Sequence, residues 1–321
     1  MYYTIRHATR FRYSASISES IMEVRAQPRS EGNQHCLDFQ LRTSPRSYVM
    51  SYRGDFGNRV HHFDIPNSHS QLTVTAESLV DMSELPELPQ TLEAGAWDVL
   101  DEATAHDEYW DTLMPSHFAC SSSLLEELAG ELHVQRRDDP LSVLRELNNA
   151  IYSSFDYSPQ TTRVDSPIDE ALRLRKGVCQ DFTHIMITLV RQLGIPCRYV
   201  SGYLFQQGRG LERVTSTAMH AWLEAYLPDL GWIGFDPTND TLVDERHVRV
   251  AIGRDYADVS PTRGVFRGKA DSELSVTVHL STPHSSVTEE PVIEPAWVAS
   301  HRDEEDQAAN LLEQQQQQQQ Q

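Results

Sequence analysis

Cysteine is scarce in this chain of 321 residues, which contains only Cys36, Cys120, Cys179 and Cys197. So few cysteines in a chain of this length do not form the disulfide framework of a small secreted domain, and we expect all four to be reduced. No two of them are separated by two residues, the spacing of many structural zinc sites, so such a site is not expected. Each cysteine is therefore a candidate either for packing or for catalysis.

Long hydrophobic runs are absent as well, although hydrophobic residues make up 39% of the chain. The run IMITLV at 185–190 is far shorter than the roughly 20 apolar residues that a membrane-spanning helix needs. The first residues, MYYTIRHATRFRYSAS, alternate polar and apolar side chains and lack the apolar centre of a signal peptide. We therefore expect a cytoplasmic protein that does not cross a membrane.

An excess of positive charge is also missing. The chain has 47 Asp and Glu against 27 Lys and Arg, which gives a formal net charge of −20. Residues 77–112 hold 11 acidic side chains and no Lys or Arg, and residues 286–321 hold 8 acidic side chains with Arg302 alone. These segments carry −11 and −7, that is −18 of the −20, so the rest of the chain is close to neutral. This balance argues against binding to nucleic acid, which requires basic surface.

Residues 1–80 have the alternation of polar and apolar side chains that is typical of β-strands. The stretch YTIRHATRFRY is one clear case. We predict an antiparallel β domain over this range. His61, His62 and His69 do not predict a metal site, because adjacent residues of a strand point to opposite faces.

The remainder of the chain divides into three parts by composition. Residues 81–118 are acidic and interrupted by prolines, which indicates an extended linker. Residues 119–285 carry helix signals followed by strand signals, for example Asp139 as the cap of a helix that starts at Pro140. The tail, 286–321, is acidic and ends in eight glutamines, so we predict that it is disordered.

The stretch RKGVCQDFTHIMITLVRQLGIPCR (175–198) predicts a helix with Cys179 in its first turn. Its apolar residues follow helical spacing from Phe182 to Leu193, and a Gly-Ile-Pro sequence ends it. The unpaired N–H groups and partial positive charge of a helix N-terminus stabilise a thiolate and can receive an oxyanion. Free cysteine is also among the most buried residue types, so this stretch alone fits a nucleophile or a packing residue equally well.

The stretch TAMHAWLEAYLPDLGWIGFDPTN (217–239) predicts two strands joined by a short turn. His220 on the first strand and Asp236 on the second can supply the base, and the acid that orients it, for a cysteine nucleophile. The two side chains share a face only if the loop has an odd number of residues, so we predict three or five around Pro228. A loop of residues 227–229 would place them directly opposite each other.

These two stretches resemble the core of the transglutaminase-like superfamily, in particular its bacterial branch of proposed cysteine proteases. The likeness is carried by GVCQD at Cys179, HAW at His220 and FDPTN at Asp236, with further similarity extending over about residues 1–280. The resemblance implies an α+β class with a papain-like core, in which the nucleophile helix packs on an antiparallel sheet that bears the base and the acid. It also implies that the N-terminal antiparallel β domain precedes this core, and that Cys179, His220 and Asp236 are the catalytic residues.

The activity implied by the resemblance is acyl transfer from an amide through a thioester on Cys179. We expect hydrolysis of peptide or amide bonds, because water is abundant and no amine pocket is evident in the sequence. A protein-glutamine transglutaminase and a non-catalytic interaction scaffold are the alternatives. No cofactor and no metal are expected, since the core contains no calcium-binding loop. The expected partner is a peptide or protein substrate, and neither nucleic acid nor a membrane.

Residues around these three positions have simpler predicted roles. Asp181 is expected to be a carboxylate favoured by the helix N-terminus rather than a catalytic group. Trp222 and Trp232 are expected to be core or rim aromatics rather than walls of a substrate channel. Glu224 is predicted to be solvated or ion-paired. The polar, glycine-containing loop at 206–217 is suited to a flap that faces the substrate.

Overall fold

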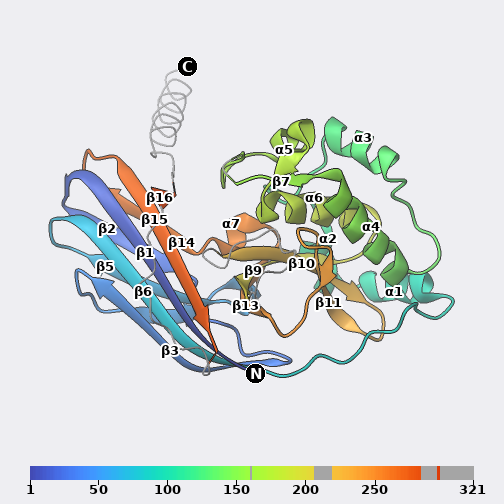
Figure 1. Cartoon of the computed structure of the whole chain (residues 1–321), viewed down its shortest axis with the longest axis horizontal. Helices are drawn as coiled ribbons and strands as arrows, with labels where there is room; N and C mark the ends of the chain where they lie inside the picture. Colours follow the sequence, from blue (N-terminus) through green and yellow to red (C-terminus); the bar gives the residue numbers. More distant parts are fainter. Residues whose placement is uncertain (160, 206–218, 283–294, 297–321) are drawn as a thin grey trace, which may run out of the picture.

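The computed structural model describes residues 1–159, 161–205, 219–282 and 295–296. Two parts lie side by side: a β-rich part, and a part in which helices cover a central sheet (Figure 1). This arrangement matches the α+β class expected from the sequence. Among the described helices, none combines the length and the apolar character needed to cross a bilayer.

The β-rich part is a sandwich of two antiparallel sheets. The first sheet has the order β16 (Pro295–Ala296), β15 (Ser272–Ser281), β1 (Tyr2–Ile17), β6 (His69–Met82) and β3 (Gln34–Ser44). The second has the order β14 (Thr262–Arg267), β2 (Glu19–Val24), β5 (Arg59–Ile65) and β4 (Met50–Arg53), and the short 3-10 helix η1 (Asp55–Gly57) precedes β5. Alternate side chains of both sheets form one buried apolar cluster, which includes Ile17, Phe63 and Leu72. The period-two pattern of the sequence therefore corresponds to one face of each sheet in the core.

The sandwich includes strands from both ends of the chain. β15 pairs with β1 from Thr4↔Ser281 to Tyr13↔Ser272, and β14 pairs with β2. The division made from the sequence assigned residues 262–285 to the catalytic part, whereas β14 and β15 extend the two N-terminal sheets. No local pattern predicts this pairing, because the partners lie more than 200 residues apart in the chain.

The second part is built on the antiparallel sheet β12-β11-β10-β9-β13. Its strands are β9 (Cys197–Leu204), β10 (His220–Leu227), β11 (Gly231–Asp236), β12 (Thr241–Leu242) and β13 (His247–Gly253). Helix α6 (Cys179–Gln192) packs on one face of β9 and β10. Ala221, Leu223 and Ala225 of β10 share an apolar cluster with residues of α6 such as Ile185, as the alternation in the sequence predicts.

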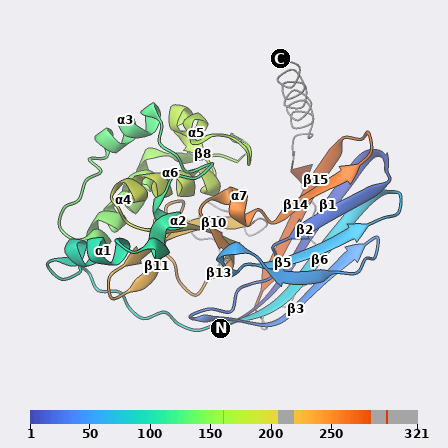
Figure 2. The same cartoon turned by 180° about the vertical axis from the view of Figure 1, so that it is seen from behind.

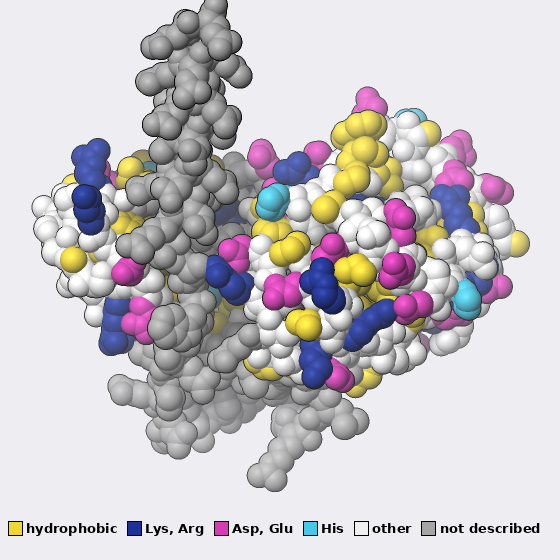
Figure 3. Space-filling model, turned by 90° about the horizontal axis from the view of Figure 1, so that it is seen from above, with side chains coloured by type: hydrophobic (Ala, Val, Ile, Leu, Met, Phe, Trp, Pro, Cys, Tyr) yellow, Lys and Arg dark blue, Asp and Glu magenta, His cyan; other side chains and the backbone are white. Residues whose placement is uncertain are grey.

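Further helices and a short strand pair surround this sheet. They are α1 (Ala96–Thr104), η2 (Asp107–Tyr109), α2 (Trp110–Leu113), α3 (Ser123–Glu131), α4 (Pro140–Ser154), α5 (Ile168–Leu174), α7 (Tyr256–Val259) and the parallel pair β7 (Asp156–Tyr157) and β8 (Lys176–Gly177). On the face that Figure 3 shows, the acidic and basic side chains over this part are interspersed rather than gathered by sign.

The acidic segment 81–118 is held against the helical part. Leu100 of α1 is fully buried in its apolar cluster. The guanidinium of Arg191, on α6, donates hydrogen bonds to the backbone carbonyl oxygens of Thr112 and Met114. The segment expected to be an extended linker therefore contains helical turns that cover the core.

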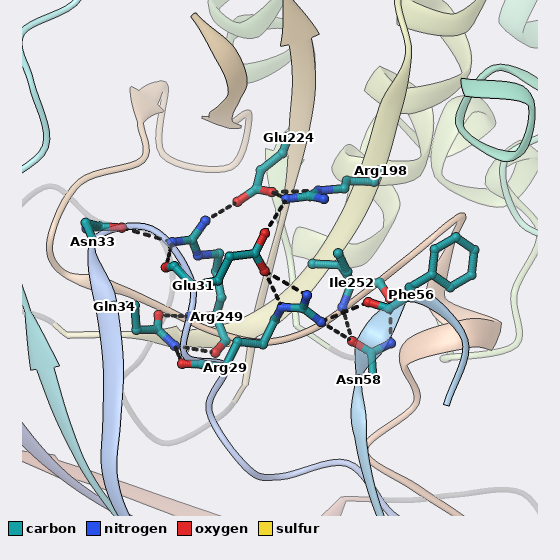
Figure 4. Close-up of polar contacts among 10 residues, drawn as sticks. All are labelled: Arg29, Glu31, Asn33, Gln34, Phe56, Asn58, Arg198, Glu224, Arg249 and Ile252. Atoms are coloured by element: carbon teal, nitrogen blue, oxygen red, sulfur yellow. Dashed lines mark hydrogen bonds and ion pairs between the residues drawn. The ribbon is translucent and has the colours of Figure 1, made fainter. Parts of the chain in front are cut away.

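The sandwich meets the central sheet at its edge strand β13, which lies toward the sandwich in Figures 1 and 2. The carboxamide of Gln34 accepts from the N–H of Arg249 (2.7 Å) and donates to its C=O (2.8 Å). The carboxamide of Asn58 pairs with Ile252 in the same way, at 2.9 and 2.6 Å. Two side chains thus take the place of a neighbouring strand and satisfy peptide groups that an edge would leave open (Figure 4).

Charged groups reinforce this junction. Glu224 on β10, only 2% exposed, pairs with Arg198 of β9 (2.6 Å) and with Arg249 of β13 (3.3 Å). Arg249 also donates to the backbone carbonyl of Glu31, and Arg29 pairs with the Glu31 carboxylate (Figure 4). The ion-paired role predicted for Glu224 is confirmed, and these contacts join three strands of the sheet to the sandwich.

Candidate active site

Cys179 is the first residue of α6 and is half-buried against the apolar core of the helical part. The carboxylate of Asp181 accepts from the backbone N–H of Val178 (2.8 Å) and from the hydroxyl of Thr162 (2.5 Å). A Cβ on Gly177 would lie 2.7 Å from an Asp181 oxygen, so a glycine is needed where the chain approaches this carboxylate. Asp181 therefore fixes the start of the helix, and with it the backbone of Cys179, in the role expected for it.

The hairpin predicted around Pro228 is present. β10 and β11 pair from Leu223↔Phe235 to Leu227↔Gly231, which leaves a loop of three residues, 228–230. The prediction of an odd loop is confirmed, but the register is shifted by two positions from direct opposition. If this pairing is extended by one position beyond Leu223↔Phe235, Asp236 lies opposite Trp222. Asp236 is then diagonal to His220 and on the same face of the sheet.

His220 and Asp236 meet across this diagonal. The Nε2 atom of His220 lies 2.7 Å from Oδ2 of Asp236, and both side chains are almost wholly buried. Asp236 also accepts from the backbone N–H of Thr238 (3.0 Å) and from the amide of Asn239 (2.7 Å). A buried carboxylate with several donors is held in its ionised form and in one orientation.

The other ring nitrogen of His220 is Nδ1. Nδ1 is buried and makes no hydrogen bond to a described residue. Burial by itself lowers the pKa of His220, but the Asp236 carboxylate outweighs burial and, with a further contribution from Cys179, raises this pKa to about 10. The pKa of Asp236 is lowered well below its ordinary value, because the charge of His220 outweighs the effect of burial. Cys179 is thus close enough to the His220 ring to affect its pKa, while Asp236 pairs with Nε2 of the same ring.

Comparison with known proteins places the chain in a family. Residues 127–237 match the model of the transglutaminase-like superfamily, and residues 3–81 match the bacterial transglutaminase-like N-terminal region. An uncharacterised protein of Mycobacterium leprae is 31% identical over 86% of this chain and 96% of its own length. One of Mycobacterium tuberculosis is 33% identical over 87% of this chain and 92% of its own length. The chain belongs to the transglutaminase-like superfamily.

Solved structures agree with this assignment. The crystal structure of a proposed cysteine protease of Cytophaga hutchinsonii covers 94% of the chain and 95% of its own, with a TM-score of 0.69 and 22% identity. At this identity the likeness concerns the fold, and it confirms the transglutaminase-like architecture expected from the sequence. A protein-glutamine gamma-glutamyltransferase of Pseudomonas aeruginosa is 28% identical over 136 residues, which is 40% of this chain and 20% of that protein.

A second histidine in this transglutaminase-like chain was not predicted. His247, the first residue of β13, brings Nε2 to 3.4 Å from the same Asp236 oxygen that His220 contacts. The sequence offered one signal: a histidine begins the apolar stretch HVRVAIG. His220 likewise is the first residue of β10. Nothing in the sequence indicates that β13 returns to the side of Asp236.

His220, Asp236 and His247 are also the one group among the described residues whose ligand-type atoms lie close enough to suit a metal ion, within 4.8 Å of one another. The separations of 2.7 and 3.4 Å between each imidazole nitrogen and the carboxylate oxygen are those of hydrogen bonds. As they stand, these groups satisfy one another, so the arrangement is explained without a metal ligand set.

Several other side chains lie around these groups. Trp222 is fully buried with Val200 and Ile252, so it is a core aromatic, as expected. Trp232 is half-buried beneath the guanidinium of Arg198, 4.3 Å from the ring centroid. The loop 206–217, predicted as a substrate flap, lies outside the described residues.

Tyr157 is a further group near the thiol. It lies in β7, and its partner strand β8 ends two residues before Cys179, with Tyr157 paired to Gly177. Burial raises the pKa of the Tyr157 phenol, and the charge of Cys179 raises it further. The hydroxyl is therefore within electrostatic range of the sulfur, on the partner of the strand that leads into the nucleophile helix.

Proposed function

We propose that this protein catalyses acyl transfer on amide bonds through a Cys179–His220–Asp236 triad, with hydrolysis of a peptide or amide as the reaction. The observation that carries the proposal is a half-buried thiol at the start of a helix, beside an imidazole whose other nitrogen is paired with a buried carboxylate. A nucleophile, a base and an orienting acid in this order are the elements of thiol-dependent catalysis.

The proposed steps use the atoms described above. Because the pKa of His220 is raised, the proton of the Cys179 thiol rests on Nδ1 of His220 at neutral pH, and the thiolate attacks the carbonyl carbon of the amide. His220 then gives this proton to the leaving amine as the C–N bond breaks, which leaves a thioester on Cys179. Water attacks the thioester and loses a proton to Nδ1, and the products are a carboxylic acid and the thiolate of Cys179 paired with the His220 imidazolium. Asp236 keeps Nε2 protonated throughout and balances the imidazolium charge.

Two donors are available for the oxyanion that forms in each addition step. The backbone N–H of Cys179 lies at the N-terminus of α6, where peptide dipoles favour negative charge. We propose the hydroxyl of Tyr157 as the second donor, because Tyr157 pairs with Gly177 on the strand that leads into the helix and the charge of Cys179 contributes to its raised pKa. Both groups are fixed by the strand pair that precedes the helix.

The first test is the pH dependence of alkylation by iodoacetamide, with peptide mapping, on the wild type and on His220→Ala. We expect Cys179 to react fast at about pH 6, well below the ordinary thiol pKa, and to lose this advantage without His220. Cys120 is exposed and serves as the reference thiol within the same molecule. Equal rates at Cys179 and Cys120 would contradict the proposal and favour the non-catalytic scaffold.

Transamidation is the second candidate, because a protein-glutamine gamma-glutamyltransferase is among the relatives of the chain. The two reactions share the thioester and differ only in whether water or an amine attacks it. Adding a fluorescent primary amine to a glutamine-containing acyl donor separates them. Release of acid or ammonia without incorporation of the amine supports hydrolysis, and covalent incorporation supports transamidation.

A further inference from the structure

Asp236 is shared between two imidazoles, although the proposed mechanism uses only one of them. His220 and His247 both direct Nε2 at Oδ2 of Asp236, at 2.7 and 3.4 Å. Their side chains are equally inaccessible, with 1% of each residue exposed. A buried, titratable ring in contact with the orienting acid therefore has no role yet.

The far side of the His247 ring is bound by a second carboxylate. Nδ1 lies 2.9 Å from Oδ1 of Asp244 and 3.2 Å from its backbone nitrogen. Arg246 in turn donates to Oδ2 of Asp244 at 2.8 Å. The neutral ring with a proton on Nε2 accepts from the Asp244 N–H, and the imidazolium donates to both carboxylates. In either form Nε2 donates to Asp236, so hydrogen bonds run from Asp236 through His247 to Asp244.

Packing fixes the plane of the His247 ring. Trp222 meets it edge-on, with ring centroids 5.3 Å apart and an interplanar angle of 76°. Trp222 itself packs against β9, where a Cβ on Gly202 would lie 2.5 Å from its indole. The ring of His247 is therefore directed at Asp236 by its surroundings and not only by the hydrogen bond.

We infer that His247 is a positioning residue of this site: it holds the Asp236 carboxylate in the place from which Asp236 orients His220. The inference rests on the proposed function for its effect on the chemistry of Cys179. The contact between His247 and Asp236 exists whether or not that function is correct. His247 touches neither the thiol nor the leaving group, and it acts through Asp236 alone.

The charge of His247 gives this role a signature that packing alone would not give. Burial lowers the pKa of His247, but the hydrogen bonds and charges of Asp236 and Asp244 outweigh burial and raise it. A cation at His247 opposes a second cation at His220, whose ring centroid is 6.3 Å away. The positive charge of Arg246 is paired with the Asp244 carboxylate. A neutral donor in place of His247 should therefore make His220 easier to protonate.

The test compares two substitutions at this position. His247→Gln keeps a donor for Asp236 without the charge, and His247→Leu removes both. A matched control is His69→Gln, a buried histidine of the sandwich bonded to Ser20 and to the Asn67 carbonyl. For each protein, the rate of Cys179 alkylation at neutral pH is measured, and the ring proton of His220 is titrated by NMR.

We expect His247→Leu to slow alkylation of Cys179 by roughly tenfold to a hundredfold, because Asp236 is no longer held in place. His247→Gln should stay within a few-fold of the wild type while the titration midpoint of His220 moves to higher pH. Asp244→Asn should move this midpoint in the same direction, since it withdraws the support of a charged His247. His69→Gln should leave both the rate and the midpoint unchanged.

Unchanged rates and an unchanged His220 midpoint in folded His247→Gln and His247→Leu would overturn the inference. So would an equal loss of rate in both variants with an unmoved midpoint, which is the behaviour of a packing residue. If His247→Leu does not fold, the midpoints in His247→Gln and Asp244→Asn decide. Failure of the proposed function has a different result: wild-type Cys179 reacts no faster than Cys120, while the His220 titration still reports on His247.

Discussion

Asp236 and His220 form a buried ion pair whose effect on stability depends on pH. The pKa of His220 is raised from 6.5 to about 10, so the folded state binds this proton more tightly than the unfolded state does. The resulting stabilisation is complete below about pH 6.5 and is lost as the pH rises toward 10. Asp236→Asn removes the charge that raises this pKa and leaves a buried imidazole that favours its neutral form.

We therefore expect the free energy of unfolding of the wild type to fall between about pH 6 and 10 relative to that of Asp236→Asn. Urea unfolding of both proteins at about pH 6, 8 and 10 measures the difference, in which the contributions of other titrating groups cancel. A constant difference across this interval would contradict a raised His220 pKa in the folded state.

Tyr157 offers a second prediction at the scale of one residue. If its hydroxyl donates to the oxyanion, Tyr157→Phe should lower kcat by about a hundredfold or more, the usual effect of losing one such donor. Alkylation of Cys179 should change little, because forming the thiolate does not use this donor. Measuring both on the same preparation separates the two steps. A parallel loss of alkylation would mean that Tyr157 supports the thiol instead.

The positions of Cys179, His220 and Asp236 could be predicted because each lies in a short motif with its own local signal. The helix start, the strand parity and the odd loop are all encoded within a few residues, and the loop and shared face were found as predicted. The register differed by two residues, which parity alone does not decide. His247 could not be found in this way, because its contact with Asp236 depends on how β13 is placed.

Among the elements, β13 links the sandwich to the site residues. It carries His247 at its start, and Gln34 and Asn58 bind the peptide groups of Arg249 and Ile252 along its free edge. Replacing Gln34 with Leu leaves the N–H of Arg249 without its partner, whereas the C=O still accepts from the backbone N–H of Arg29. Such a loss costs about 1–3 kcal/mol.

We expect Gln34→Leu to lower the free energy of unfolding by about this amount and to slow alkylation of Cys179, since β13 would be less firmly held. Gln71→Leu on β6 changes an exposed carboxamide of the sandwich and should alter stability by no more than about 0.5 kcal/mol. Urea unfolding and the alkylation assay measure both effects. If Gln34→Leu is destabilised but its Cys179 is alkylated at the wild-type rate, the placement of β13 does not affect the site.

Element prediction succeeded where the signal is local and failed where it is not. The period of apolar residues predicted α6, and alternation predicted strands in the N-terminal region. The acidic segment 81–118 suggested a linker by composition, because its few buried side chains, such as Leu100, are diluted by charge. β14 and β15 give ordinary strand signals, but their partners β2 and β1 are set by the tertiary fold.

At the scale of the whole molecule, this pairing makes β14 and β15 part of the two sheets of the sandwich. A chain that stops after Ser260 lacks β14 and β15, so β1 and β2 would each present an unpaired edge. It would also uncover apolar side chains of the sandwich, since Phe266 packs against its core. A chain that stops after Thr282 keeps both strands, and among the strand pairs of the described residues it loses the two between β15 and β16.

We expect the chain 1–282 to fold, to unfold in a single transition and to keep the alkylation rate of Cys179. The chain 1–260 should be insoluble or lack a cooperative transition, although Cys179, His220, Asp236 and His247 are all present in it. Circular dichroism with thermal unfolding, followed by the alkylation assay, compares the two. A folded and reactive 1–260 chain would show that the helical part forms its site without the completed sandwich, and the coupling through β13 would then be dispensable.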